Sequence, residues 1–172
     1  MTADLTTPHQ ASSSRTRDPG LVAIALHLRD RLDAIPLSLL TLCARVFPAA
    51  VFWQSGQTKV EGWHVTDGAV ALFREEYRLP LVDPWLAAHL AAFAEHAFPV
   101  LLVLGLASRL SAAALLGMTL VIEVLVYPDA WPTHGVWATC FLMVIARGPG
   151  ILSIDALIAR RYRHLRGWPA GR

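Results

Sequence analysis

Four long apolar segments constrain this chain more than any other feature of its sequence. They cover residues 35–56, 85–106, 110–127 and 131–146. A helix needs roughly 20 apolar residues to cross the hydrocarbon core, because no backbone polar group can stay unpaired there. The chain is 55% hydrophobic and 16% charged, which is far too apolar for a soluble domain of 172 residues. The sequence therefore predicts an all-α integral membrane protein, a four-helix bundle whose transmembrane helices lie at these positions.

The remaining segments are arranged around this predicted bundle. Residues 1–19 are polar and lack the apolar core of a signal peptide, so we expect a disordered cytoplasmic tail. Residues 20–160 are expected to form one membrane domain, in which residues 58–84 make an outer loop. Residues 161–172 are expected to form a basic cytoplasmic tail.

Two flanking helices are predicted at the membrane surface. Between Leu21 and Ile35, apolar residues recur at helical spacing with charged residues among them, which is typical of an interfacial helix. The start of a cytosolic helix fits this pattern equally well. Ser153 can cap the second flanking helix, whose basic cluster suits anionic lipid, although membrane topology explains the cluster more simply. The cluster consists of Arg160, Arg161, Arg163 and Arg166.

The distribution of Lys and Arg predicts the orientation. Eleven of them lie in the two terminal segments and in the turn between the second and third helices, against three in the outer loop. Because positive residues are retained on the cytoplasmic side, both termini are expected there. Topology thus accounts for most of the net charge of +2, and no nucleic-acid partner is inferred.

Six ionisable residues fall inside the apolar segments, where each costs about 2.5–3.5 kcal/mol and so normally faces a partner within the bundle. They are Arg45, His89, Glu95, His96, Glu123 and His134. A rise of about 1.5 Å per residue from the outer helix ends places Arg45 and Glu95 together at about 15 Å depth. This predicts a buried Arg45–Glu95 ion pair, which in the simpler interpretation only fixes the register of the first two helices.

A second polar cluster is predicted near the outer surface. It consists of His89, His96, Glu123, His134, Gln54 and Lys59. The same count of helix rise places His89, Glu123 and His134 about 5–6 Å below the outer surface. His96 shares a helix face with His89. Such a set can relay protons, ligate a metal or hydrogen-bond a quinone head group. The spacing of these residues along the chain is not that of a known metal motif, so His89, Glu123 and His134 are only weak candidates for metal ligands. No catalytic residue is predicted.

The residue pattern resembles the DoxX family of small bacterial membrane proteins. Three stretches carry the resemblance: ARVFPAAVFWQSGQTK (44–59), AEHAFPVLLVLGLASRLSA (94–112) and RGPGILSIDAL (147–157). Together they extend over roughly residues 36–158. The resemblance implies a four-helix protein of the bacterial inner membrane, often linked to sulfur or thiol redox systems. Some members are subunits of a thiosulfate:quinone oxidoreductase, and others are partners of proteins that handle oxidative stress.

These observations lead to three functional hypotheses. The first is an accessory subunit of a redox system that interacts with a quinone or with protons, has a protein partner and has no independent catalytic activity. A quinone is then the candidate cofactor. The second is a non-enzymatic membrane anchor or assembly partner. The third, a small transporter or metal-handling protein, is less favoured because the chain shows no inverted repeat. The sequence leaves the substrate, the partner and the oligomeric state open.

Overall fold

The protein is described by a computed structural model over residues 19–165, and the chain divides into two units, Met1–Ile35 and Pro36–Arg172. In the first unit, helix α1 (Pro19–Asp33) carries an ion pair between Arg29 and Asp33, one turn apart. The predicted flanking helix is therefore present, and its place at a membrane surface stays a prediction. The tail expected before it lies outside the described residues.

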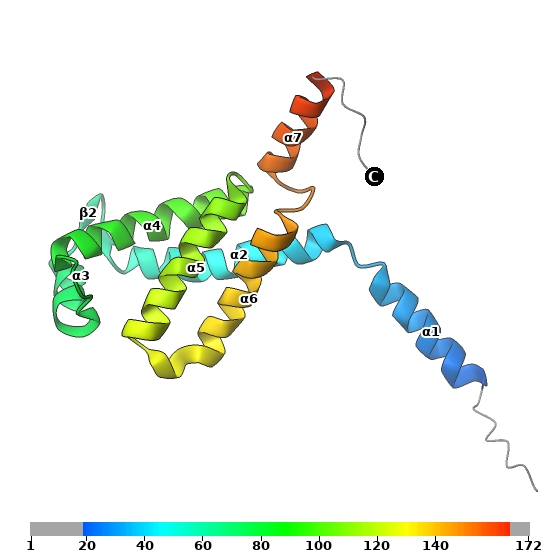
Figure 1. The fold of residues 1–172 in the computed structure, drawn as a ribbon, viewed down its shortest axis with the longest axis horizontal. Coiled ribbons are helices and arrows are strands. Elements are labelled where there is room, and N and C mark those ends of the chain that lie inside the picture. The colour runs from blue at the N-terminus through cyan, green and yellow to red at the C-terminus, as the bar shows by residue number, and fades with distance from the viewer. Residues whose placement is uncertain (1–18, 166–172) are drawn as a thin grey trace, which may run out of the picture. The chain divides into compact units, whose positions relative to one another are not determined.

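The second unit contains four long helices at the predicted positions (Figure 1). They are α2 (Leu37–Gln57), α4 (Pro84–Leu104), α5 (Ser108–Leu125) and α6 (Trp131–Arg147). The capping residues of helix α4 explain where it begins and ends. The Asp83 carboxylate accepts hydrogen bonds from the first free N–H groups, Pro84 needs no partner there, and Gly105 ends the helix in a left-handed conformation.

These four helices pack around a shared apolar core. Helix α2 contacts α4 and α6, and α5 contacts the same two helices. The core is built of alanine, larger aliphatic and aromatic residues, including Ala49, Phe52, Leu102, Leu115 and Phe141.

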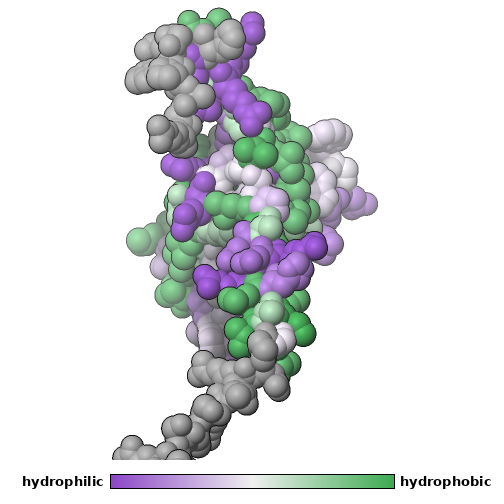
Figure 2. Space-filling view, turned by 90° about the vertical axis from the view of Figure 1, so that its right-hand side faces the viewer, coloured by the Kyte–Doolittle hydropathy of each residue, from purple (hydrophilic) through white to green (hydrophobic). Residues whose placement is uncertain are grey.

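Polarity in this unit is inverted relative to a soluble protein. Arg45, Glu95 and His134 are buried, while large apolar side chains such as Phe93 and Val124 are exposed. Figure 2 shows hydrophobic residues on the outer surface of the molecule. A surface of this kind suits contact with lipid rather than with water.

Three of the four helices, α2, α4 and α5, are long and apolar enough to cross a membrane. Helix α6 has 17 residues, which gives it a length of about 26 Å against a hydrocarbon core of about 30 Å. An all-α membrane protein is therefore supported.

The predicted outer loop is folded. It contains a short hairpin of β1 (Val60–Glu61) and β2 (His64–Val65), helix α3 (Asp67–Leu72) and the π-helical turn η1 (Phe73–Tyr77). Phe73 packs with Ala87 and Ala88 in a second small core, which holds the loop against the first half of α4.

The segments after α5 complete the unit. The 3-10 turn η2 (Pro128–Ala130) joins α5 to α6, and α7 (Ile154–Leu165) follows the loop after α6. The Ser153 hydroxyl accepts a hydrogen bond from the N–H of Ala156, which confirms the predicted cap. Residues 161–165, expected to belong to a tail, continue α7, and 166–172 lie outside the described residues.

Candidate functional site

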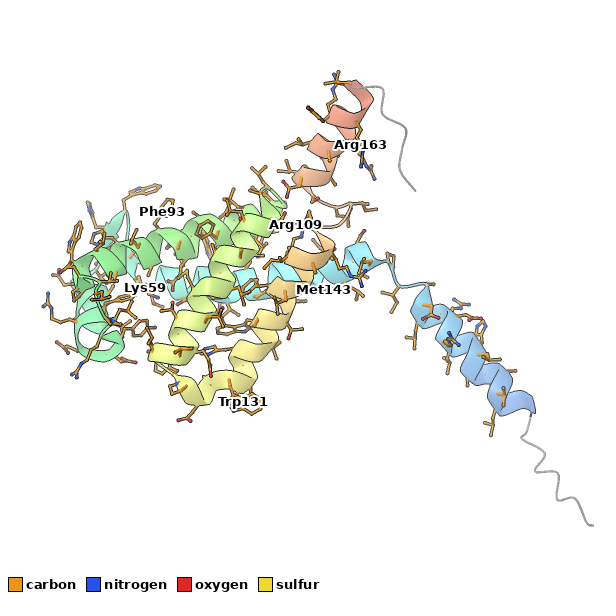
Figure 3. All side chains as sticks on the ribbon, viewed as in Figure 1. Lys59, Phe93, Arg109, Trp131, Met143 and Arg163 are labelled. Atoms are coloured by element: carbon orange, nitrogen blue, oxygen red, sulfur yellow. The ribbon has the colours of Figure 1, made fainter. Side chains whose placement is uncertain are left out.

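A buried ion pair joins Lys59, which is labelled in Figure 3, to Glu95, where α2 ends against the middle of α4. The Lys59 ammonium lies 2.8 Å from Oε2 and 3.0 Å from Oε1 of Glu95, and both side chains are about 4% exposed. Ser55 completes the group, because its hydroxyl lies 3.0 Å from the ammonium and donates to Glu95 Oε1 at 3.4 Å. A glutamate is thus held out of water with its countercharge in place.

The predicted Arg45–Glu95 ion pair is wrong. The depth count placed the ends of the first two helices at one level, whereas α2 stops beside the middle of α4. A Cβ on Gly56 would lie 3.1 Å from that of Glu95, which is ten residues beyond Trp85. Because of this stagger, Glu95 meets the end of α2, about 16 Å along the helix from Arg45.

Arg45 instead binds backbone carbonyls at the other end of the bundle. Its guanidinium donates to the oxygen of Leu152 at 2.6 Å and to that of Leu102 at 3.4 Å. These bonds connect α2 to the end of α4 and to the loop that precedes α7. Arg45 is fully buried, and its contacts are those of a residue that holds helices together.

His96 lies beside the ion pair, with both ring nitrogens in use. Nδ1 lies 2.6 Å from the carbonyl oxygen of Ala92, which can only accept, so Nδ1 carries the proton. Nε2 then accepts from the Gln57 amide at 2.9 Å. Gly56 makes this approach possible, since a Cβ there would lie 2.9 Å from the His96 ring. His96 is therefore a neutral, satisfied hydrogen-bonding residue.

The predicted outer-side cluster is only partly assembled. His134 Nδ1 lies 2.5 Å from Glu123 Oε2, which links α6 to α5. His89 is not part of this pair: it stacks on Trp85 and its Nδ1 bonds the carbonyl of that residue at 2.7 Å. Gln54 lines a separate apolar groove between α2 and α4.

The three weak metal candidates are likewise not brought together. Across residues 19–165, no three His, Cys, Asp or Glu side chains are grouped as the ligands of a metal ion would be. The structure leaves the pair of Glu123 and His134, which is two ligands short of a tetrahedral site.

The Glu95 cleft, a space of about 400 Å³ between α4, α5 and η1, opens beside the ion pair. Its walls are almost entirely apolar, and Glu95 and Tyr77 supply the polar groups. Glu95 Oε2 lies 2.8 Å from the Lys59 ammonium in the ion pair, and it accepts no hydrogen bond of ordinary geometry among the described residues. The wall of the cleft thus holds an ion-paired carboxylate that keeps acceptor capacity for a further donor.

A chain of polar groups leads from this cleft to the outer loop. The rings of Tyr77 and Tyr127 pack edge to face with centroids 6.0 Å apart, and the Tyr127 hydroxyl donates to the exposed Glu76 carboxylate. Burial raises the pKa of Tyr77, and the negative charges of Glu95 and Glu76 raise it further, so the phenol keeps its proton at neutral pH. Sequence reasoning missed both tyrosines, because Tyr77 lies in the loop, Tyr127 only ends the third apolar segment, and the fold of the loop is what brings their rings together.

Comparison with known proteins gives one match. The DoxX family model matches residues 40–128, which is more than half of the chain and runs from α2 into η2. No curated protein and no solved structure matches the chain. The matched region contains Lys59, Glu95 and the whole Glu95 cleft.

Proposed function

Because this chain belongs to the DoxX family of membrane proteins, we propose that it is an accessory subunit of a redox system and that it binds a quinone-type ligand in the Glu95 cleft. In this proposal α2, α4, α5 and α6 all cross a bacterial inner membrane as a four-helix bundle. Both termini are cytoplasmic, and the folded loop of residues 58–84 lies outside. The distribution of positive residues supports this orientation.

The observation that carries the proposal is an ion-paired carboxylate with remaining acceptor capacity in the wall of an otherwise apolar cleft. A quinol has an apolar ring and hydroxyl donors, so the ring would occupy the apolar walls while a hydroxyl donates to Glu95 Oε2. Leu90 and Val121, which line the cleft, are exposed on the lipid-facing surface. A membrane-dissolved ligand would therefore reach the cleft from the bilayer.

Reduction of a quinone also requires protons, and the polar chain supports their supply. Tyr77 lines the cleft, and Tyr127, whose ring packs against it, hydrogen-bonds to Glu76 at the exposed side of the loop of residues 58–84. A hydroxyl can accept one proton while it donates another, so such a chain can conduct protons. The electrons would come from a partner protein, which fits an accessory subunit without independent catalytic activity.

The test uses a substitution that fills the Glu95 cleft and leaves Lys59 and Glu95 unchanged. Gly117 lines the Glu95 cleft, and a Cβ there meets nothing within 4 Å, so Gly117→Leu places a side chain in the cleft without a backbone clash. The matched control is Gly135→Leu, a helical glycine of α6 with the same open surroundings. The probe is the reduced form, a benzoquinol with a short alkyl tail kept under a reductant, titrated into the detergent-solubilised protein. Stability should rise by about 2.7 kcal/mol when the ligand is at 100 times Kd.

The expected result is stabilisation of the wild type and the Gly135→Leu variant but not of Gly117→Leu. Equal stabilisation of all three proteins, or of none, would refute binding in this cleft. Glu123→Gln and His134→Ala test the outer-side pair as the alternative quinone site. Loss of binding in those two variants, with Gly117→Leu unaffected, would move the site there.

A second candidate function is that of a non-enzymatic anchor or assembly partner. It is favoured because each buried charge has its partners within the protein: Arg45 donates to backbone carbonyls, and Lys59 pairs with Glu95. Replacing both Lys59 and Glu95 with Met distinguishes the two functions. A folded double variant that keeps its cellular function would support the anchor, and a folded variant that loses it would support the ligand site.

A further inference from the structure

A second cavity, of about 450 Å³, lies at the opposite end of the bundle, where α5 begins and α6 ends. We refer to it as the arginine cavity, because Arg109 and Arg147 both line it. The Arg109 guanidinium reaches to 3.5 Å from where a Cβ on Gly148 would stand, beside Arg147 in the chain. Figure 3 shows Arg109 at the start of α5. Two cationic side chains from neighbouring helices thus share one space.

Neither arginine has a countercharge in the part of the chain that the structure describes. Asp155 also lines the cavity, but its two oxygens accept hydrogen bonds from the N–H groups of Ala107 and Ser108, each at 2.9 Å. The helix dipole of α6 stabilises the positive charge of Arg147, which lies in its last turn. The dipole of α5 does the opposite for Arg109, because this residue lies in the first turn, where a helix favours negative charge. No contact among the described residues therefore explains the position of Arg109, beyond the positive-inside distribution of the chain.

The two arginines are the polar side chains of the lining that a ligand can reach. Both are exposed, whereas Ser108, which also lines the cavity, is fully buried with its hydroxyl beside the Asp155 carboxylate. A ligand in this cavity would therefore meet two guanidinium groups.

We propose that the arginine cavity binds the phosphate of an anionic phospholipid. Two guanidinium forks match the oxygens of a phosphate. The ends of α5 and α6 are the level at which lipid head groups lie, and the apolar side chains of Leu110 and Ala159 would contact the glycerol and the first acyl carbons. This site shares no residue with the Glu95 cleft, so it stands independently of the quinone proposal.

The test compares two charge-matched double variants of the full chain in an uncharged detergent. Arg109→Gln with Arg147→Gln removes the cations of the cavity, whereas Arg160→Gln with Arg161→Gln removes the same charge from α7, outside the cavity lining. The probes are dioctanoyl phosphatidylglycerol, dioctanoyl phosphatidylcholine and inorganic phosphate, with affinity measured by calorimetry. We expect the cavity variant to lose affinity for phosphatidylglycerol about tenfold or more and the α7 variant to lose much less.

Several outcomes would overturn the site. Equal losses in the two double variants would mean that phosphatidylglycerol responds only to overall charge. Tight binding of phosphatidylcholine would exclude a preference for anionic lipid, and inorganic phosphate that displaces the lipid at equal concentration would mark a site for free phosphate. If the cavity variant unfolds, Ala159→Trp provides the second test, because it fills the cavity without changing charge. Unchanged lipid affinity in that variant would refute the proposal.

Discussion

Lys59 and Glu95 hold opposite charges out of water, so each depends on the other. Replacing either residue alone with Met leaves a buried, unpaired charge, and we expect a loss of about 3–5 kcal/mol in the free energy of unfolding. Replacing both should cost far less than the sum. Chemical unfolding in detergent measures all three variants, with Arg29→Ala as a control because its ion pair with Asp33 is exposed and worth under about 1 kcal/mol. Additive losses would show that the pair is not coupled.

Tyr127 reports on the polar chain that leads to the cleft. Its hydrogen bond to Glu76 raises its pKa from 10.0 to about 12, because the phenol donates to a carboxylate. An ultraviolet titration of phenolate should therefore show a tyrosine that ionises near pH 12 and disappears in Tyr127→Phe. In Glu76→Gln the same group should titrate closer to 10.0. A Tyr127 that ionises normally in the wild type would contradict this hydrogen bond.

At the scale of elements, the turn between α4 and α5 depends on a glycine. Gly105 has a φ of 71°, and a Cβ there would stand 2.1 Å from Arg45 Nη1 and 2.8 Å from the Ser153 backbone. Gly105→Ala should cost about 1–3 kcal/mol in backbone strain alone, and more through displacement of Arg45. Gly135→Ala, where a Cβ meets nothing, should instead stabilise α6 by about 0.5–1 kcal/mol. Thermal unfolding compares the two, and similar effects would argue against a close turn.

Helix α7 is attached to this turn by Asp155, which makes the attachment sensitive to acid. Burial acts to raise the pKa of Asp155, but the hydrogen bonds from Ser108 and Ala107 outweigh it and lower the pKa below 3.8. The stabilisation is therefore present above 3.8 and is lost as pH falls through the lower, folded value. Melting temperatures from about pH 6 downward should fall less steeply in Asp155→Asn, which starts less stable. An identical pH profile would exclude Asp155 as the acid-sensitive group.

At the scale of the whole molecule, apolar length and composition were enough to predict the positions of α2, α4, α5 and α6 within a few residues. The residue pattern was also enough to identify the family. The partner of Glu95 was not predictable, because it depends on how far α2 slides along α4, and no local pattern encodes that stagger. Tyr77 and Tyr127 were missed for a related reason. Tyr77 reaches the cleft only through the packing of Phe73 on Ala87, a contact between a loop and a helix, and Tyr127 lies against Tyr77.

Whether three or four helices cross the membrane depends on α6. Four crossings place both termini on one side, whereas a surface-bound α6 would leave α7 on the outer side with the hairpin. In a background with Cys43 and Cys140 replaced by Ala, we expect an impermeant maleimide to label Trp63→Cys and Asp129→Cys in intact cells. Arg161→Cys should react only after permeabilisation. If it reacts together with the other two, α6 does not cross, and the arginine cavity, which opens between α6 and α7, would not face cytoplasmic lipid.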